Sequence, residues 1–389
     1  MPKVLFVVGN WVWGGGGLQK TVKMLIENLP ARWEREVLSL HPSPVIMRIG
    51  RRKDLPVPKN VKMHMIEKNA IVSRFLSLIR FLKESKPDII SAHISPAGDF
   101  PLLILARKIA HTSAPLILWN HGFRQFPRRY RPFAPLVKYM LRKNVNTIVA
   151  ISQGLEKFIE KVWRVPREKL MTIYPPRVGE EMLRAAEEVP KEYKLFPPQN
   201  IKIVAVARLS PREKDFQTLL RAFALLRKKY KKANLFLVGG GGEKDVAQIM
   251  QWIEGLSLRD SVFLVGHRAN PYPYIKYADI SVLSSVSEGL GMVIVESMAL
   301  GCPVIATDCP FGPRELIGNN ENGIIVPMKD YIKMAEGMMK ILEDEELRNK
   351  IIENAKKKAE EFRISTSVQK FEGLLNKLLK ETRRNGDVI

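Results

Sequence analysis

Short runs of apolar and β-branched residues alternate with longer amphipathic segments along the whole sequence. This alternation is typical of βα units, in which each strand of a parallel sheet is followed by a helix. The runs form two series, and a chain of 389 residues is long enough for two domains with separate cores. The sequence therefore predicts an α/β protein with two Rossmann-like sheets. The expected strands are residues 3–8, 37–40, 89–92, 116–119 and 147–151 in the first half, and 201–207, 235–238, 262–265, 280–283 and 304–307 in the second.

A polar stretch marked by prolines separates the two series. Proline pairs stand near its two ends, at positions 175–176 and 197–198. We expect a first domain over residues 1–178, a second over 199–364, and a C-terminal helix and tail over 365–389. Open α/β sheets bind ligands outside the carboxyl ends of their strands, so we expect the two domains to face each other across a cleft. The apolar spacing of the last helix fits either simple packing on the nearest domain or a return to the first domain.

Most of the net charge of +23 lies in the first half of the chain. Residues 1–177 contain 31 Lys and Arg but only 11 Asp and Glu, an excess of 20 positive charges. Such a field attracts polyanions, which include nucleic acid, anionic lipid headgroups and phosphorylated acceptors. Charge alone does not choose among these partners.

No uninterrupted apolar run approaches the roughly 18 residues that span a bilayer. The apolar start at residues 4–8 runs into a glycine tract where a signal peptide would have its cleavage site, so we expect a cytoplasmic protein. The two cysteines, Cys302 and Cys309, form no CxxC pair and lie on a segment that reads as buried strand and loop. We expect buried thiols here, and no disulfide or structural metal.

Two glutamates lie eight positions apart in the segment 284–306, which reads SSVSEGLGMVIVESMALGCPVIA. The pattern predicts Glu288 in a loop after a strand and Glu296 on the following helix, beyond its first turn. Gly289 and Gly291 would let backbone amides approach a ligand, and the helix N-terminus favours a phosphate. A carboxylate facing a cleft could accept two hydrogen bonds from a ribose diol. Spacing alone leaves an alternative open, in which Glu288 caps the helix and Glu296 faces solvent.

Two cations follow the first strand of the second half. The stretch VARLSPREKDFQTLLRAF places Arg208 at the strand end and Lys214 in the next loop, where they could neutralise a diphosphate leaving group. The sequence contains no D-x-D triplet, so we do not expect magnesium held by paired aspartates to do this. The alternative is a solvated basic loop.

The order of these motifs resembles the family-4 group of retaining glycosyltransferases, which have the two-domain GT-B fold. Arg208 and Lys214 are followed by GHR at 266–268, ADISVLSSVSEGLG at 278–291, Glu296, and GCPVIA at 301–306. Asp215 departs from the family, which commonly has glycine after the lysine. The residues that the resemblance implies for donor binding are Glu296 at the ribose hydroxyls, Arg208 and Lys214 at the diphosphate, Glu288 with the amides of Leu290, Gly291 and Met292 at the transferred sugar, and His267 and Arg268 near the base.

The first half holds a glycine tract and two histidines. Gly16 and Gly17 end a run of four glycines that does not fit G-x-G-x-x-G, so no dinucleotide cofactor is expected, but the run is similar to the family's phosphate-contacting loop. A flexible surface turn is the alternative. His93 and His121 each follow an apolar strand. His121 matches the family histidine that faces sugar and acceptor, and we expect His93 near the acceptor, although a lone histidine is more often structural.

Basic and aromatic residues interleave in GFRQFPRRYRPFAPLVKYMLRK, residues 122–143, which includes Arg124 and Arg128. This composition suits an anionic membrane surface and also single-stranded nucleic acid. A core helix with a solvated basic face remains a third interpretation. We favour the membrane because the first domain of GT-B enzymes binds the acceptor, and we expect no nucleic acid. Arg124 and Arg128 are then candidate acceptor contacts.

The sequence thus predicts a retaining transferase that moves a hexose or N-acetylhexosamine from a nucleotide diphosphate sugar. The segment 307–317 resembles members that use UDP-sugars with lipid-linked or polysaccharide acceptors. We expect no metal and no further cofactor, Glu288 and His121 as the catalytic residues, and a peripheral position on the inner face of the cytoplasmic membrane. Two alternatives are a nucleotide-sugar epimerase or phosphorylase of the same fold, and a non-catalytic basic module that binds membrane or nucleic acid.

Overall fold

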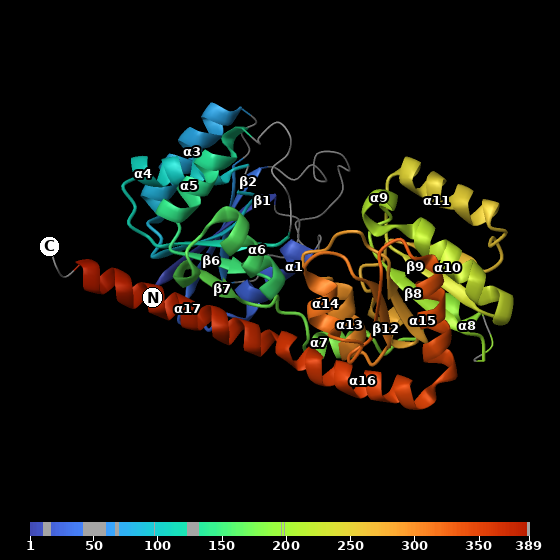
Figure 1. Cartoon of the computed structure of the whole chain (residues 1–389). Coiled ribbons are helices and arrows are strands. Elements are labelled where there is room, and N and C mark those ends of the chain that lie inside the picture. Colours follow the sequence, from blue (N-terminus) through green and yellow to red (C-terminus); the bar gives the residue numbers. More distant parts are fainter. Residues whose placement is uncertain are drawn as a thin grey trace. The chain divides into compact units, whose positions relative to one another are not determined.

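The chain folds into two compact units in a computed structural model, which describes residues 1–10, 17–41, 60–66, 70–96, 98–122, 132–195, 197 and 199–386. Unit 1 consists of Met1–Pro176 and Ile364–Ile389, and unit 2 of Arg177–Arg363 (Figure 1). The chain therefore passes from one unit to the other twice. Within the described residues, no helix is both long enough and apolar enough to cross a membrane.

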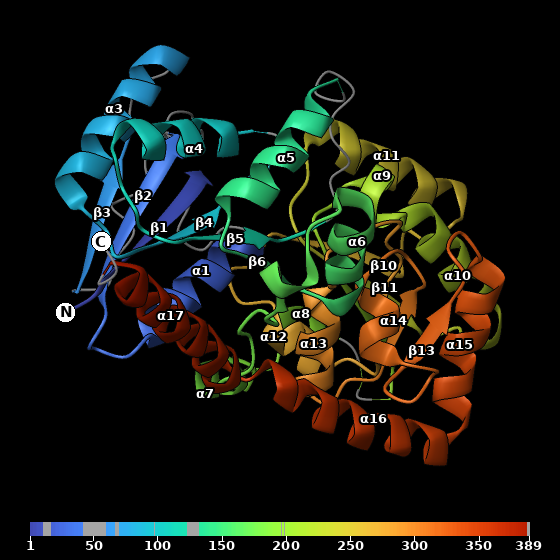
Figure 2. The same ribbon diagram turned by 60° about the vertical axis from the view of Figure 1, so that its left-hand side comes forward.

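Unit 1 is built on a seven-stranded parallel sheet with the strand order β3-β2-β1-β4-β5-β6-β7. Strand β1, in the interior of the sheet, contains the run VLFVV, every residue of which is buried. Helices α1 and α17 lie together on one face of the sheet, and α3, α4 and α5 lie side by side on the other (Figure 2). The strands are β1 (Lys3–Asn10), β2 (Glu34–His41), β3 (Val61–Met65), β4 (Ile89–His93), β5 (Leu116–Asn120), β6 (Thr147–Ala150) and β7 (Leu170–Thr172), and the helices are α1 (Gly17–Asn28), α3 (Ile71–Ser85), α4 (Phe100–Ile109), α5 (Ala134–Asn144), α6 (Gln153–Trp163), the 3-10 turn η2 (Arg167–Lys169) and α17 (Ile364–Gly386).

Unit 2 is a second parallel α/β layer, with a six-stranded sheet in the order β10-β9-β8-β11-β12-β13. Its core joins β8, β9 and β11 to α10 through fully buried residues such as Ile203, Leu235 and Phe223. The strands are β8 (Lys202–Val206), β9 (Asn234–Val238), β10 (Val262–Gly266), β11 (Ile280–Leu283), β12 (Val304–Thr307) and β13 (Ile324–Val326). The helices are α7 (Glu180–Ala185), α8 (Lys191–Lys194), α9 (Pro211–Lys214), α10 (Phe216–Lys229), α11 (Glu243–Gly255), α12 (Tyr272–Lys276), α13 (Met292–Ala299), α14 (Gly312–Ile317), α15 (Tyr331–Glu343), α16 (Glu345–Ala359) and the 3-10 turn η3 (Glu360–Phe362).

The two Rossmann-like sheets predicted from the sequence are confirmed, and each of the ten expected strands is present. Sequence reasoning missed β3, β7 and β13. Strand β3 lies at the sheet edge and alternates between intermediate and exposed residues, so it has no apolar run. Strands β7 and β13 have three residues each, which is too short for a periodic signal.

The proline-marked stretch packs as part of unit 2 and is not a bare linker. Tyr193 of α8 is buried, its ring lies 4.5 Å from that of Phe236, and its hydroxyl donates a hydrogen bond to the Tyr274 carbonyl at 2.7 Å. The structure therefore assigns the residues from Arg177 onward to unit 2.

The C-terminal helix α17 returns to unit 1, as one of the two interpretations of its apolar spacing predicted. Its buried Phe371 packs against Phe6 of β1 and Trp119 of β5, with ring centroids 6.1 and 5.6 Å apart. The last segment of the chain thus completes the core of the first unit.

Candidate active site

The loop between β11 and α13 carries the two glutamates singled out in the sequence. Glu288 lies in the loop, and Glu296 is the fifth residue of α13. The residue before the helix is Gly291, whose φ of 88° lies in the left-handed region that glycine adopts without strain, and no side chain caps the helix. Glu288 therefore does not cap α13, and that alternative is wrong. Leu290, Gly291 and Met292 are the residues at the start of this helix, as expected.

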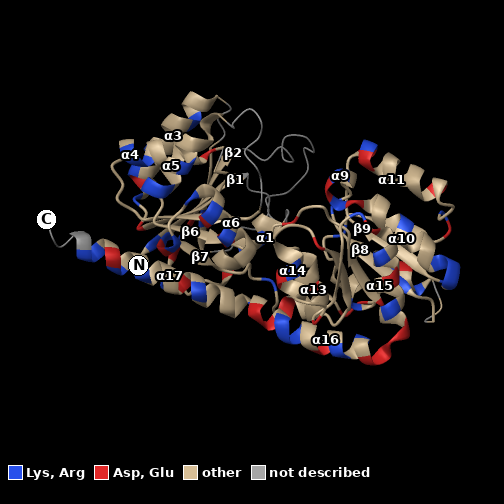
Figure 3. Ribbon diagram, in the orientation of Figure 1, with Lys and Arg blue, Asp and Glu red and all other residues tan. Residues whose placement is uncertain are grey.

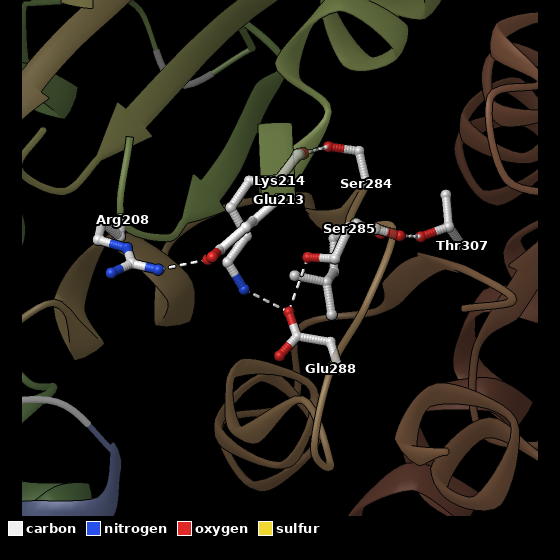
Figure 4. A network of polar contacts seen from close by, with 8 residues as sticks. Arg208, Glu213, Lys214, Ser284, Ser285, Glu288 and Thr307 are labelled. Atoms are coloured by element: carbon white, nitrogen blue, oxygen red, sulfur yellow. Dashed lines mark hydrogen bonds and ion pairs between the residues drawn. The ribbon is translucent and has the colours of Figure 1, made fainter. Parts of the chain in front are cut away.

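Glu288 forms an ion pair with Lys214, the last residue of α9 (Figure 4). The same carboxylate oxygen accepts a hydrogen bond from Ser285 Oγ at 2.7 Å. The side chains of Lys214 and Glu288 are only 18% and 14% exposed, so water screens their attraction less than it would at an open surface. The structure thus joins a cation and a carboxylate that lie 74 positions apart in the sequence.

Main-chain hydrogen bonds hold the two loops of this ion pair together. Ser284 Oγ donates to the Lys214 carbonyl at 2.6 Å, and the Val286 amide donates to the Glu213 carbonyl at 3.0 Å. Thr307 at the end of β12 donates in turn to the Ser285 carbonyl (Figure 4). The carboxyl ends of β8, β11 and β12 therefore share one hydrogen-bonded network.

Asp215 keeps the conformation that the family's glycine would favour. Its φ is 42°, in the left-handed region, and its carboxylate caps α10 by accepting from the Thr218 amide at 3.3 Å and the Thr218 hydroxyl at 2.7 Å. Aspartate is one of the few residues that tolerate this region, and its side chain is a good helix cap. The departure from the family pattern therefore leaves a defined turn after Lys214.

Arg208 lies at the end of β8 and is far more exposed than Lys214. Its side chain is 63% exposed and pairs with that of Glu213, which is 54% exposed. Such surface pairs contribute about 0–1 kcal/mol, so the arginine can exchange this partner for a ligand at little cost.

A glycine run that sequence reasoning overlooked supports the Arg208 loop. A Cβ on Gly239, directly after β9, would lie 1.8 Å from the Ala207 carbonyl oxygen, so only glycine fits this close approach. The Leu209 amide donates to the Gly240 carbonyl at 2.8 Å. The available signal was the sequence GGGG at residues 239–242, which follows an expected strand.

Glu296 is buried and paired, so the alternative of a solvated face is wrong. It is 6% exposed, and its Oε1 lies 3.5 Å from Nε of Arg177. Arg177 is itself only 1% exposed. Sequence reasoning did not single out this arginine, because it stands in the proline-marked stretch and no motif connects it to α13.

The loop after β10 contains His267 and Arg268. The Arg268 guanidinium is bonded to Glu192 Oε1 at 2.7 Å and to the Tyr274 hydroxyl at 3.1 Å. Its side chain is thus held within unit 2. The Gly266 carbonyl accepts from the Gly239 amide at 3.0 Å, so this loop also adjoins the glycine run. His267, the residue before Arg268, is exposed, and its place near a base stays a prediction.

The two expected histidines of unit 1 form a pair. His93 is the last residue of β4, His121 directly follows β5, and Nδ1 of His93 lies 2.9 Å from Nε2 of His121. Nε2 of His93 lies 3.2 Å from Ser91 Oγ, and its ring stacks on Trp119 with centroids 5.1 Å apart. His93 is 1% exposed with both ring nitrogens partnered, so it cannot make the direct acceptor contact that we expected of it. Instead, its Nδ1 holds the ring of His121 in place.

Burial keeps both imidazoles neutral. It lowers the pKa of His121 to about 3, and burial together with the neighbouring His121 lowers the pKa of His93 well below its ordinary value. A neutral His121 can offer a substrate either an N–H donor or a lone pair, depending on its tautomer.

The remaining predictions concern the glycine tract, two arginines, the two cysteines and metal binding. Gly17 is the first residue of α1, while Gly16, Arg124 and Arg128 lie outside the described residues. Cys302 and Cys309 are free, buried thiols, as expected, and burial raises the pKa of Cys309 to about 12. In the described part of the chain, no group of three His, Cys, Asp or Glu side chains could hold a metal ion. Metal independence remains a prediction.

Comparison with known proteins identifies the family. The pattern described as "Glycosyltransferase Family 4" matches residues 15–177, and "Glycosyl transferases group 1" matches residues 187–358. The chain belongs to this glycosyltransferase family. The two patterns together cover both units, so the resemblance seen in the second half extends to the first.

Relatives and solved structures agree with this membership. An uncharacterized glycosyltransferase of Methanocaldococcus jannaschii is 26% identical over 344 residues, covering 78% of this chain and 83% of that protein. The N-acetylgalactosamine-N,N'-diacetylbacillosaminyl-diphospho-undecaprenol 4-alpha-N-acetylgalactosaminyltransferase of Campylobacter jejuni is 36% identical over 160 residues, 41% of this chain and 42% of that protein. The crystal structure of Anabaena HepE in complex with UDP superposes with a TM-score of 0.78 and 19% identity, covering 96% and 100% of the two chains. The fold is therefore that of the GT-B glycosyltransferases.

The low pKa of His121 predicts that acid destabilises unit 1. An unfolded histidine has a pKa of about 6.5, so between about pH 6.5 and pH 3 the unfolded chain binds a proton that the folded chain does not. Each unit by which the pH falls through that window should lower the free energy of unfolding by up to about 1.4 kcal/mol, as the contribution of this residue. His121→Asn should remove that share of the pH dependence in urea unfolding at pH 6.5, 5.5 and 4.5. The control is His111→Asn, at an exposed position, which should leave the pH dependence unchanged. Equal slopes for wild type and His121→Asn would contradict the prediction.

Proposed function

We propose that this glycosyltransferase moves a hexose or N-acetylhexosamine from a UDP-sugar to a lipid-linked or polysaccharide acceptor, with retention of anomeric configuration and without a metal ion. The observation that carries the proposal is the cluster at the carboxyl ends of the unit 2 strands. There, Lys214 and Glu288 form a partly buried ion pair, and Glu296 stands two turns further along the same loop and helix.

The positions of the charges suit the departure of a nucleotide diphosphate. Negative charge develops on the leaving diphosphate, and fixed cations and amides that face it lower the barrier. Arg208 is exposed and weakly paired, Lys214 is held by its network, and the N-terminus of α13 adds partial positive charge. These groups give the protein a means of stabilising the leaving group with its own side chains.

Two arguments from the relatives support the substrate class. HepE and TarM, which share the fold, have both been solved in complex with UDP, and this favours a uridine nucleotide. The Campylobacter jejuni relative that matches 41% of this chain acts on a diphospho-undecaprenol-linked acceptor, and this favours a lipid-linked acceptor.

Retention does not require a covalent intermediate. Glu288 is the carboxylate nearest to the place proposed for the sugar, but its Oε1 is engaged by Lys214 and Ser285. A same-face attack by the acceptor hydroxyl, in which Glu288 holds the sugar, needs no nucleophile from the protein. In this reading neutral His121 of unit 1 hydrogen-bonds the sugar or the acceptor hydroxyl.

We further propose that unit 1 rests on an anionic membrane through helices α3, α4 and α5. These neighbouring helices carry large apolar side chains that are exposed, and they carry Lys and Arg as well (Figure 3). Apolar groups that insert below the headgroups and cations that pair with them are the two contributions that hold a protein on a bilayer surface. The exposed apolar residues are Ile71, Val72, Leu76, Leu105, Ile109, Phe133, Leu136 and Tyr139.

Nucleotide binding tests the donor site. Wild type in EDTA should bind UDP more tightly than GDP or ADP in calorimetry, and Glu296→Ala should lower the UDP affinity at least tenfold because it removes a charged acceptor of the ribose hydroxyls. Glu343→Ala, at an exposed glutamate of α15, is the matched control and should bind like wild type. If wild type binds none of the three nucleotides, the proposed function is wrong.

Removal of the Lys214 charge tests the leaving-group argument. Lys214→Gln should lower kcat by about 10²–10³, since a single preorganised group facing the developing charge contributes that much. Lys229→Gln removes a lysine of similar pairing from the surface, where its partner is Glu343, and should leave kcat within about twofold. Rates are measured as UDP release with donor and acceptor present. An unchanged kcat in Lys214→Gln would reject this role.

Vesicle sedimentation tests the membrane surface. The double variant Leu105→Ser and Leu136→Ser should bind vesicles of phosphatidylcholine with phosphatidylglycerol about tenfold more weakly, and salt should weaken wild-type binding. Leu195→Ser, at a leucine of unit 2 that is 77% exposed, is the control and should sediment like wild type. Equal sedimentation of the double variant would contradict the proposal.

A further inference from the structure

Arg177 occupies the first position of unit 2, directly after the chain leaves unit 1. Its backbone amide and that of Val178 both donate to the Phe362 carbonyl at 3.0 Å, and Val178 forms a β-bridge with Arg363. The two segments by which the chain enters and leaves unit 2 are therefore hydrogen-bonded to each other. This arrangement fixes the backbone from which the Arg177 side chain projects.

The Arg177 side chain extends from this point to α13. It is 1% exposed, and its Nε lies 3.5 Å from Oε1 of Glu296. It also hydrogen-bonds the hydroxyl of Tyr272, at the start of α12. Among the described residues, Nε and Nη1 have no partner at hydrogen-bond geometry, so the charge of Arg177 is balanced by the ion pair with Glu296. A buried guanidinium and a buried carboxylate at this distance hold each other, since either one alone would be strongly destabilising.

We propose that Arg177 is a positioning residue that holds the Glu296 carboxylate in one orientation, and that it thereby sets the preference of the site for ribonucleotides over deoxyribonucleotides. This inference rests on the proposed function, in which Glu296 accepts hydrogen bonds from the ribose. Arg177 lies beside Oε1, which leaves Oε2 to accept from the hydroxyl groups. With one oxygen held by the guanidinium, the carboxylate presents the other in a fixed direction, as a geometry-specific hydrogen bond to a hydroxyl requires.

The role of Arg177 is separable from that of a ligand contact. At 1% exposure the guanidinium is covered by protein, so its removal acts on the nucleotide through its neighbours Glu296 and Tyr272 and not by a direct contact. A purely structural arginine would change the binding of every nucleotide by the same factor. A positioning arginine changes the binding of those nucleotides that carry the hydroxyl read by Glu296.

The test compares the affinities for UDP and 2′-deoxy-UDP, measured by calorimetry on the full chain. Wild type should prefer UDP by roughly 10- to 100-fold, the range expected for a hydrogen bond to a charged group. Arg177→Met should reduce this preference to about threefold or less while it binds 2′-deoxy-UDP within about threefold of wild type. Arg177→Lys, which keeps a cation, should retain most of the preference, and Glu296→Gln should lose it.

Further variants and outcomes keep the test decisive. Arg177→Gln lacks the charge but keeps donors for Tyr272, and it takes the place of Arg177→Met if that variant does not fold. Arg35→Met removes another buried arginine, in unit 1, and should leave the preference unchanged. Two results with a folded, charge-free Arg177 variant would overturn the inference but not the proposed function. In one the variant retains the wild-type preference, and in the other it binds both nucleotides more weakly by the same factor. Wild type that binds UDP no better than 2′-deoxy-UDP also overturns it, whereas wild type that binds no UDP overturns the proposed function as well.

Discussion

Parallel pairing of every strand is the constraint on which the rest of the structure depends. In a parallel sheet all carboxyl ends lie at one edge, so loops that are far apart in the sequence meet there. Unit 2 uses this edge to join residues near Lys214, Glu288 and Thr307 in one hydrogen-bonded network. Unit 1 uses its own carboxyl edge to pair His93 with His121. Each of these two side-chain clusters is therefore a consequence of sheet topology before it is a consequence of any single residue.

Three ion pairs of unit 2 differ in how deeply they are buried, and the difference matches the role proposed for each. The pair of Arg208 and Glu213 is exposed and readily exchanged. The pair of Lys214 and Glu288 is partly buried and supported by neighbouring hydroxyls.

The third pair, Arg177 with Glu296, is the most buried of the three. Exposure of the cations thus decreases from the proposed position of the diphosphate toward that of the ribose. In the proposed mechanism, the groups that meet a changing charge are the exposed ones, and the group that recognises the ribose is the buried one.

The central strands, the spacing of Glu288 and Glu296, and the cations after β8 could be predicted from the sequence. Each of these is a local pattern of at most about twenty residues. The sequence did not show β3, an edge strand with no buried residue, or β7 and β13, which have three residues each. It also could not show that Arg177 meets Glu296 or that Arg268 is tied to Glu192, because these contacts join positions that are far apart and carry no shared motif. His93 was expected to face a ligand because it ends a strand, and only the packing of Ser91 and Trp119 around it shows that it is enclosed.

The position of α17 has a consequence for synthesis of the chain. Domains generally fold as units in the order in which they leave the ribosome. Unit 2 is one continuous segment and is complete once Arg363 has been made, but unit 1 lacks Phe371 until the last helix emerges. During translation the faces of Phe6 and Trp119 that this helix covers stay open while the whole of unit 2 is produced. Of the two units, the first to begin folding is thus the last to finish, and the nascent chain carries an uncovered apolar surface while all of unit 2 is made.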